Sequence, residues 1–265
     1  MEQDGFDRGT ARTAAELRMQ LAQMTAASQM LERNARDEKS RGYLAALNQS
    51  ICRMLRIVGR MELTARLTEQ QEPQPELAPA DLGELVSGLG GQLAGLLEHI
   101  GVRLSVRAPA HLAAQADSGL IRQMLLELVA NAAREGDRVE LALARHGDKA
   151  VFTVTDNGAG MTAEVLDRLF RGDEEQTPDW RRKGNGVAIA RRIAALHGGT
   201  LMADSGPDRG LSVTAAIPLG QAWSDWLDSP SLDWDRGGFD EALVALSGLL
   251  PAGAFAPEKA GDAAM

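Results

Sequence analysis

The sequence predicts an α+β protein in which an N-terminal antiparallel helical hairpin precedes an α/β two-layer sandwich. Two observations lead to this fold class. Residues 13–67 repeat apolar side chains at alternating steps of three and four, with one charged interruption, as paired helices do. Residues 81–219 then alternate helical segments with β-rich segments linked as hairpins, without the regularity of a βαβ fold.

The hairpin is predicted from two heptad stripes. The apolar or small stripe residues of segment 13–33 are Leu17, Leu21, Met24, Ser28 and Leu31, and those of segment 43–67 are Leu44, Leu47, Ile51, Met54, Val58, Met61 and Ala65. The charged stretch 34–42 ends in Gly42 and is the expected loop. Two helices with such narrow seams bury them best in a homodimer that forms a four-helix bundle. A hairpin that packs on the next domain of its own chain is the alternative. We therefore assign residues 1–72 to a dimerisation hairpin.

A linker is expected at residues 73–80, because Pro73, Pro75 and Pro79 favour extended backbone. The sandwich domain follows at residues 81–219, and Asp81 is predicted to cap a helix that ends at residue 99. The other expected elements are strands at 102–106, 113–116, 139–145, 150–155, 200–204 and 211–217, and helices at 118–135, 162–170 and 186–197. A hairpin turn is expected at Gly147-Asp148 and a mobile loop at the polar stretch 172–183.

Residues 220–265 form an acidic tail with a character of its own. It contains three of the four tryptophans of the chain, Trp223, Trp226 and Trp234, and a short helix is expected at 239–250. Two interpretations stay open at this point. Either the tail packs back on its own domain, or it is an interaction segment for another molecule.

The composition argues against several classes of protein. A net charge of −9 disfavours nucleic acid as the main partner, because phosphate binding needs a basic face. No run of eighteen apolar residues occurs and the first residues do not resemble a signal peptide, so we expect no membrane span and a cytoplasmic protein. The single cysteine, Cys52, cannot form an internal disulfide and is interpreted as part of the apolar core.

Three short elements, spread over about sixty residues, carry the candidate chemistry. The first is an apolar helix on which Glu127 and Asn131 lie four residues apart and so share one face. Carboxylate and amide oxygens can hold Mg²⁺, which in turn binds nucleotide phosphates. Arg134 lies one turn further on, within reach of a phosphate oxygen. Taken alone, these residues are more typical of a solvated helix face.

The second element, Asp156-Asn157-Gly158-Ala159-Gly160, follows a strongly β-forming run. Gly158 and Gly160 permit positive φ and a close approach of backbone to a ligand. The carboxylate of Asp156 can accept a hydrogen bond from an adenine amino group, and such a charge-assisted bond contributes roughly 1.5–3 kcal/mol. An ordinary Asx turn is the structural alternative.

The third element, Gly184-Asn185-Gly186, opens a helix. Unobstructed backbone amides at a helix N-terminus bind phosphate, and Arg182 and Lys183 place positive charge directly before it. A single Gly-x-Gly is non-specific. The order and spacing of all three elements together predict a site for ATP and Mg²⁺.

These elements resemble the catalytic and ATP-binding domain of histidine kinases, within the superfamily that includes gyrase. Glu127 and Asn131 resemble the N box, Asp156–Gly160 the G1 box, Leu169-Phe170 the F box, Gly184–Ala188 the G2 box, Leu196–Gly199 the usual helix end and Gly210–Val213 the last strand. The resemblance covers residues 77–219. It implies a mixed sheet backed by three helices, a nucleotide site that holds ATP and Mg²⁺, and a lid between Phe170 and Gly184.

The segment Ala15-Glu16-Leu17-Arg18-Met19-Gln20-Leu21 is similar to the pattern His-Glu-Leu-Arg-Thr-Pro-Leu of the kinases' dimerisation and phosphotransfer hairpin. Ala15 occupies the position of the phosphoacceptor histidine. The four histidines of the chain lie elsewhere, at His99, His111, His146 and His197. Without an imidazole, that position offers no nucleophile for the γ-phosphate of ATP.

The resemblance therefore implies an ATP-binding, homodimeric signalling protein without a phosphoacceptor of its own, with a response regulator or a kinase as its partner. Two alternatives stay open. One is an active kinase that phosphorylates another polypeptide. The other is an ATPase in which Glu127 acts as general base.

Overall fold

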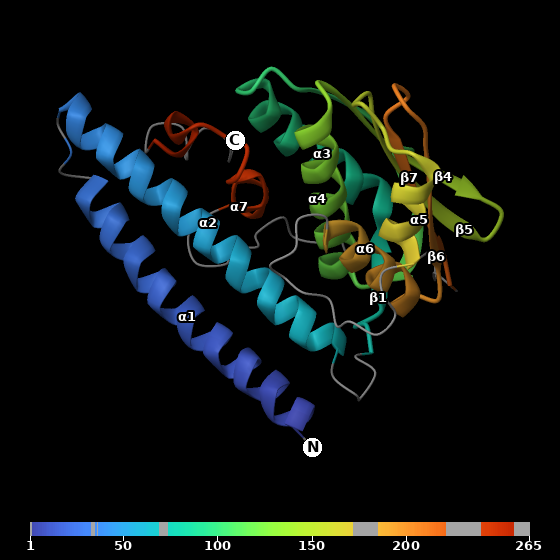
Figure 1. Ribbon diagram of the computed structural model, residues 1–265, viewed down its shortest axis with the longest axis horizontal. Helices are drawn as coiled ribbons and strands as arrows, with labels where there is room; N and C mark the ends of the chain where they lie inside the picture. Colours follow the sequence, from blue (N-terminus) through green and yellow to red (C-terminus); the bar gives the residue numbers. More distant parts are fainter. Residues whose placement is uncertain are drawn as a thin grey trace. The chain divides into compact units, whose positions relative to one another are not determined.

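The computed structural model describes residues 2–32, 35, 37–68, 74–171, 185–220 and 240–256. The chain divides into two compact units (Figure 1). A helical unit consists of Met1–Glu72 and Asp233–Met265, and a sandwich unit consists of Pro73–Leu232. Within the described part of the chain, no helix carries an apolar stretch long enough to cross a membrane.

The helical unit contains the predicted hairpin, formed by α1 (Glu2–Glu32) and α2 (Glu38–Thr68). Both helices are longer than predicted, and Gly42, expected to end the loop, lies inside α2. The earlier start of α2 has a local cause. The carboxylate of Asp37 accepts hydrogen bonds from the Ser40 backbone N–H at 2.8 Å and from the Ser40 hydroxyl at 2.6 Å, and it so caps the first turn.

Each heptad stripe divides into two sets at seven-residue spacing. One set is buried against the other helix and consists of Leu21, Ser28, Leu44, Ile51 and Val58. The other set is largely exposed and includes Leu17, Met24, Leu31, Leu47 and Met54. A bidentate ion pair between Arg18 and Glu62 joins α1 to α2 along the same hairpin. One apolar face of the hairpin is therefore buried between α1 and α2, and a second apolar face stays largely exposed.

The sandwich unit contains a five-stranded sheet in the order β2-β4-β5-β7-β6. The strands are β2 (Arg103–Arg107), β4 (Arg138–His146), β5 (Lys149–Asp156), β6 (Thr200–Ser205) and β7 (Leu211–Pro218). The β2–β4 pair is parallel and the other pairs are antiparallel, so the sheet is mixed. The predicted α+β fold class is confirmed.

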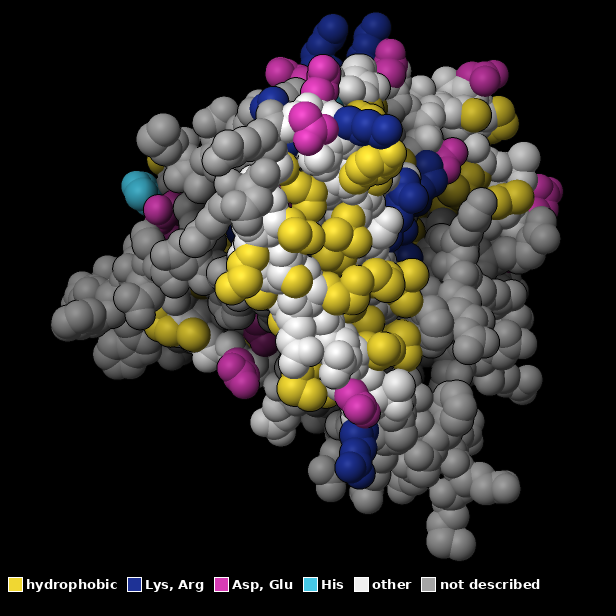
Figure 2. All heavy atoms as spheres, turned by 90° about the vertical axis from the view of Figure 1, so that its left-hand side faces the viewer, with side chains coloured by type: hydrophobic (Ala, Val, Ile, Leu, Met, Phe, Trp, Pro, Cys, Tyr) yellow, Lys and Arg dark blue, Asp and Glu magenta, His cyan; other side chains and the backbone are white. Residues whose placement is uncertain are grey.

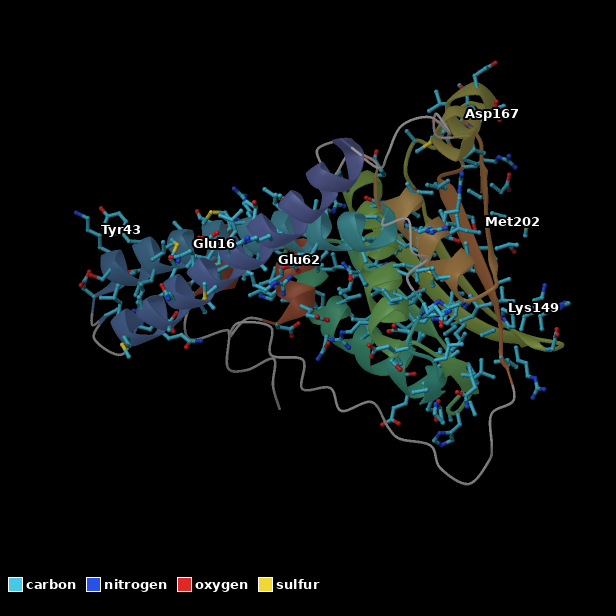
Figure 3. The ribbon with its side chains drawn as sticks, turned by 90° about the horizontal axis from the view of Figure 1, so that it is seen from below. Glu16, Tyr43, Glu62, Lys149, Asp167 and Met202 are labelled. Carbon is cyan, nitrogen blue, oxygen red and sulfur yellow. The ribbon has the colours of Figure 1, made fainter. Side chains whose placement is uncertain are left out.

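Helices α3 (Leu82–Glu98), α4 (Ser118–Glu135) and α6 (Asn185–Leu196) pack against one face of this sheet (Figure 1). The strands alternate buried and more exposed residues, because successive side chains point to opposite faces. Lys149 lies at the tip of the β4–β5 hairpin and Met202 on the edge strand β6 (Figure 3). The short helix α5 (Ala163–Arg171) precedes the expected loop 172–183, which lies outside the described residues.

A second, two-stranded sheet pairs β1 (Ala78–Asp81) with β3 (Ala113–Ala116). No strand was predicted at β1, because the prolines of this segment favoured a linker. Asp81 ends β1 and caps α3 as predicted, with its Oδ1 accepting from the backbone N–H groups of Gly83 at 2.9 Å and Glu84 at 3.2 Å. The segment is thus anchored rather than free.

The described part of the C-terminal tail contains α7 (Glu241–Leu246) and a 3₁₀ turn, η1 (Ala252–Phe255). The helix is shorter than the predicted 239–250. Both elements contact α2 and belong to the helical unit, so this part of the tail packs within its own chain, on the hairpin. The three tryptophans of the tail lie outside the described residues.

Candidate functional site

The N-terminus of α6 lies directly against the polar face of α4. Glu127 is 9% exposed and Asn131 is half-buried on that face. A Cβ atom added to Gly186 would lie 2.9 Å from Glu127 Oε2 and even closer to Asn131 Nδ2. Glycine at this position therefore lets the backbone at the start of α6 approach both side chains, and the structure brings the first and third sequence elements together.

Arg134 adds positive charge beside these two groups. It lies one turn beyond Asn131, and its Nη1 donates a hydrogen bond to Asn131 Oδ1 at 3.1 Å. The guanidinium is on an exposed part of α4. It is thus placed where it can meet a ligand that binds at Asn131.

The carboxylate of Asp156 ends β5 and is 5% exposed. Its Oδ1 accepts from the backbone N–H of Gly158 at 2.8 Å and of Leu211 at 3.3 Å. Within the described chain, no donor is directed to Oδ2. The Asx turn and the ligand-binding interpretation are therefore compatible, because one oxygen holds the turn while the other can accept from a ligand.

The turn after Asp156 is held by the loop between β6 and β7. Gly160 has φ +70°, and a Cβ there would collide with the carbonyl oxygen of Gly206. Ala159 O accepts from the Asp208 N–H at 2.7 Å. The Ser205 hydroxyl accepts from the Met161 N–H at 2.9 Å and donates to Gly210 O at 2.7 Å. Sequence reasoning missed Ser205, although its place beside two glycines of a tight loop was a usable signal.

Asn157 connects the same turn to the segment that follows α4, Asp137 and the first residue of β4, a role that sequence reasoning also missed. Its Oδ1 accepts from the Arg138 N–H at 2.9 Å, and its Nδ2 donates to Asp137 Oδ1 at 2.7 Å. The bond from Asn157 is the main cause that lowers the pKa of Asp137 below its ordinary value. These contacts hold Asp156 in a defined position relative to the helix that carries Glu127.

His197 is a structural residue in the described unit. It is buried, its Nε2 accepts from the Asp117 N–H at 3.1 Å, and its Nδ1 donates to Ile193 O at 2.8 Å. Asp117 in turn caps α4 by accepting from the Leu120 N–H at 3.0 Å. The imidazole therefore joins the end of α6 to the start of α4 and supports the approach of Gly186 to Glu127.

The remaining predicted residues, Arg182, Lys183 and Gly184, lie outside the described residues. Among the residues that are described, no three acidic, histidine or cysteine side chains converge into a metal site. Mg²⁺ commonly binds through one or two protein oxygens and completes its shell with water and phosphate oxygens. The pair of Glu127 and Asn131, with the backbone of Gly186 beside it, fits that mode of binding.

Comparison with known proteins identifies this region. Residues 116–221 match the family model described as histidine kinase-, DNA gyrase B-, and HSP90-like ATPase. The chain is 26% identical over 212 residues to sporulation kinase D of Bacillus subtilis, covering 79% of this chain and 41% of that protein. It is 30% identical over 162 residues to the sensor-like histidine kinase SenX3 of Mycobacterium tuberculosis, covering 58% of this chain and 40% of that protein.

Solved structures show the same fold. The chain of ShkA, in a full-length crystal structure in complex with AMPPNP, is similar with a TM-score of 0.63 and 24% identity, over 80% of this chain and 45% of that one. The histidine kinase AdeS of Acinetobacter baumannii is similar with a TM-score of 0.52 and 16% identity, over 77% and 95% of the two chains. The chain spans about two fifths of the length of the curated relatives named above.

Proposed function

We propose, on the premise that residues 116–221 form a histidine kinase-, DNA gyrase B- and HSP90-like ATPase domain, that this chain is a histidine-kinase-like regulator that binds Mg-ATP. In this proposal the protein acts in two-component signalling without a phosphoacceptor of its own. The observation that carries it is the convergence of the start of α6 on Glu127 and Asn131, where a Cβ at position 186 would collide with both side chains.

The described residues have separate roles in binding. Asp156 Oδ2 accepts from the adenine amino group, and the backbone at Gly158 and Gly160 lies along the base. Asn131 and Glu127 supply oxygens to Mg²⁺, and Arg134 neutralises a phosphate oxygen. The amides at the start of α6 bind phosphate, because a helix N-terminus carries partial positive charge. Bound Mg²⁺ would neutralise the charge of the triphosphate.

The absence of a phosphoacceptor rests on Ala15. This residue is exposed on α1, where the resemblance to the kinase pattern implies the phosphoacceptor histidine, and its methyl group cannot accept a phosphoryl group. The protein therefore acts through nucleotide occupancy and through the partners that its helical unit binds, a response regulator or a kinase.

The exposed set of the heptad stripes supports homodimerisation through the same unit. Leu17 and Met24 on α1, and Leu47 and Met54 on α2, keep 36–43% of their surface exposed. Figure 2, which faces the side that the hairpin occupies in Figure 1, shows hydrophobic side chains gathered along it. Two copies that join these faces complete a four-helix bundle.

The test is incubation of the full chain with γ-labelled ATP and Mg²⁺, together with a nucleotide-binding titration. We expect saturable binding and no label retained on the protein. Acid-labile label on the wild-type chain would overturn the proposal, and label on an added partner would establish phosphorylation in trans instead. Ala15→His is the matched variant. Label on this variant alone would locate the loss of autophosphorylation in the missing acceptor.

Glu127 favours one second function, hydrolysis of ATP. Its buried carboxylate faces the start of α6, the end of the site at which phosphate is expected, and a buried carboxylate there can act as general base toward water. Steady phosphate release that Glu127→Gln abolishes, with nucleotide affinity preserved, would establish an ATPase. No release above background excludes it.

A further inference from the structure

The C-terminal segment 240–256 is bound along α2 in the helical unit (Figure 1). Asp240 caps α7 by accepting from the Ala242 N–H at 2.7 Å. The buried apolar residues of the whole segment are Ala242, Leu243, Leu246, Leu250, Ala254 and Phe255. The segment and the hairpin therefore share a small apolar core.

Four side chains of α2 donate to main-chain carbonyls of this segment. Gln49 Nε2 donates to Leu250 O at 2.7 Å and Asn48 Nδ2 to Phe255 O at 3.2 Å. Two arginines meet the carbonyl end of α7, where backbone oxygens lack helical partners. The Arg53 Nε donates to Ser247 O at 3.1 Å and the Arg56 Nη1 to Ala245 O at 3.4 Å. The segment thus runs antiparallel to α2. Hydrogen bonds from α2 side chains to its main-chain carbonyls fix its path.

These donors identify a third face of α2. Residues 45, 49, 52 and 56 follow one another at steps of four, three and four and so form one stripe. Gln49 and Arg56 of that stripe bond to the segment, and Ala45 and Cys52 of the same stripe are buried. Cys52, the only cysteine of the chain, therefore lies on the α2 face that residues 240–256 cover.

We propose that residues 240–256 form a releasable strap that binds this face of α2 in cis. The chain enters the sandwich unit at residue 73 and leaves it at residue 232, so a bound strap ties both ends of that unit to the helical unit. Release opens an α2 surface that includes Cys52.

Two features of the segment favour release over permanent packing. The helix α7 has six residues, and isolated helices of that length do not form in water, so the strap is ordered only while bound. Ser247 is fully buried, and its hydroxyl has no hydrogen-bond partner in the described chain. An unsatisfied buried hydroxyl weakens binding, because the group is well hydrated when the strap is free.

Cys52 provides a built-in reporter for the test. Burial raises the pKa of its thiol to about 12, so a thiol reagent reacts with the full chain slowly at pH 8. We expect Leu250→Asp, which places a charge at a position that is 2% exposed, to release the strap. The rate of Cys52 modification should then rise more than about tenfold, with the affinity for Mg-ATP unchanged and with a loss of helical circular dichroism no larger than the six residues of α7 contribute.

The control substitution is Tyr43→Asp, because Tyr43 is 66% exposed near the loop end of the hairpin (Figure 3). It should leave the rate of modification at the wild-type value. A synthetic peptide of residues 240–256, added to the Leu250→Asp chain, should slow the modification again in a dose-dependent manner.

Two results would overturn the proposal. One is an equal rate of Cys52 modification in the wild type and in Leu250→Asp. The other is loss of the helical signal together with exposure of Cys52, since the segment would then be an inseparable part of the hairpin core. Nucleotide affinity is measured in the same samples, so a failure of the strap is distinguishable from a failure of the nucleotide site.

Discussion

Substitution of Asp156 by asparagine tests the adenine contact without removing the turn. The wild-type Oδ1 accepts from the N–H groups of Gly158 and Leu211, and the amide oxygen of asparagine can accept from both in the same way. The other oxygen becomes an NH₂ group, which is a donor. Asp156→Asn therefore preserves the local fold and places a donor opposite the amino group of adenine.

The expected loss follows from the bond that disappears. A charge-assisted hydrogen bond contributes about 1.5–3 kcal/mol, which corresponds to a roughly 10- to 150-fold rise in the dissociation constant for ATP. Because an NH₂ group can donate to the O6 atom of guanine, the preference for ATP over GTP should also fall. Isothermal titration with both nucleotides measures the two effects.

The control is Asp148→Asn. Asp148 is exposed in the turn between β4 and β5, at the opposite end of β5 from Asp156, so affinity should stay at the wild-type value. An Asp156→Asn protein that unfolds at the wild-type temperature and binds ATP as tightly as the wild type would refute the assignment of Asp156 to adenine.

Three further predictions concern stability and assembly. Burial alone would raise the pKa of Asp81, but hydrogen bonds from Leu112, His111 and the first turn of α3 lower that pKa below its ordinary value of 3.8. Asp81→Asn should therefore destabilise the sandwich unit at pH 7. In urea unfolding, the difference in stability between the variant and the wild type should vanish as the pH falls below 3.8. Ser247→Ala removes an unsatisfied buried hydroxyl, worth about 1 kcal/mol or more, and should slow Cys52 modification several-fold. Met54→Asp should prevent the proposed dimer from forming, as measured by light scattering, whereas Met202→Asp, on the exposed edge of β6, should not.

Much of the sandwich unit could be predicted because its signals are local. Asp81 is followed by a helical pattern, and a carboxylate at that point satisfies backbone N–H groups that every helix start leaves open. Gly147-Asp148 lies between two β-forming runs, and the structure pairs these runs as β4 and β5. Strand β1 was missed for the opposite reason. Its prolines argue for a linker, and only its partner β3, more than thirty residues away, makes it a strand.

The candidate site was predictable as a set of residues but not as a scaffold. Glu127, Asn131 and Asp156 stand out because polar groups in apolar or β-rich surroundings require an explanation. The turn after Asp156 is held by hydrogen bonds of Ser205 and Asn157 to residues 19 to 44 positions away along the chain. The spacing of residues in the sequence does not indicate such distant partners. The polar groups of the candidate site can therefore be proposed from the sequence, whereas the groups that position them are found only in the structure.

Helix α2 makes the same distinction within one element. Its heptad stripe correctly indicated an apolar seam, and the structure divides that seam between α1 and an exposed face. Cys52 on the third face was predicted to be part of the apolar core. Gln49 and Arg56 on the same face are typical of ordinary polar helix surface, because their partner lies about two hundred residues further along the chain. A charged residue on that face is commonly assigned to solvent. Here Arg56 donates to the C-terminal end of α7, a short helix that forms only while it is bound to α2. Helix α2 and the strap of residues 240–256 must therefore be considered together.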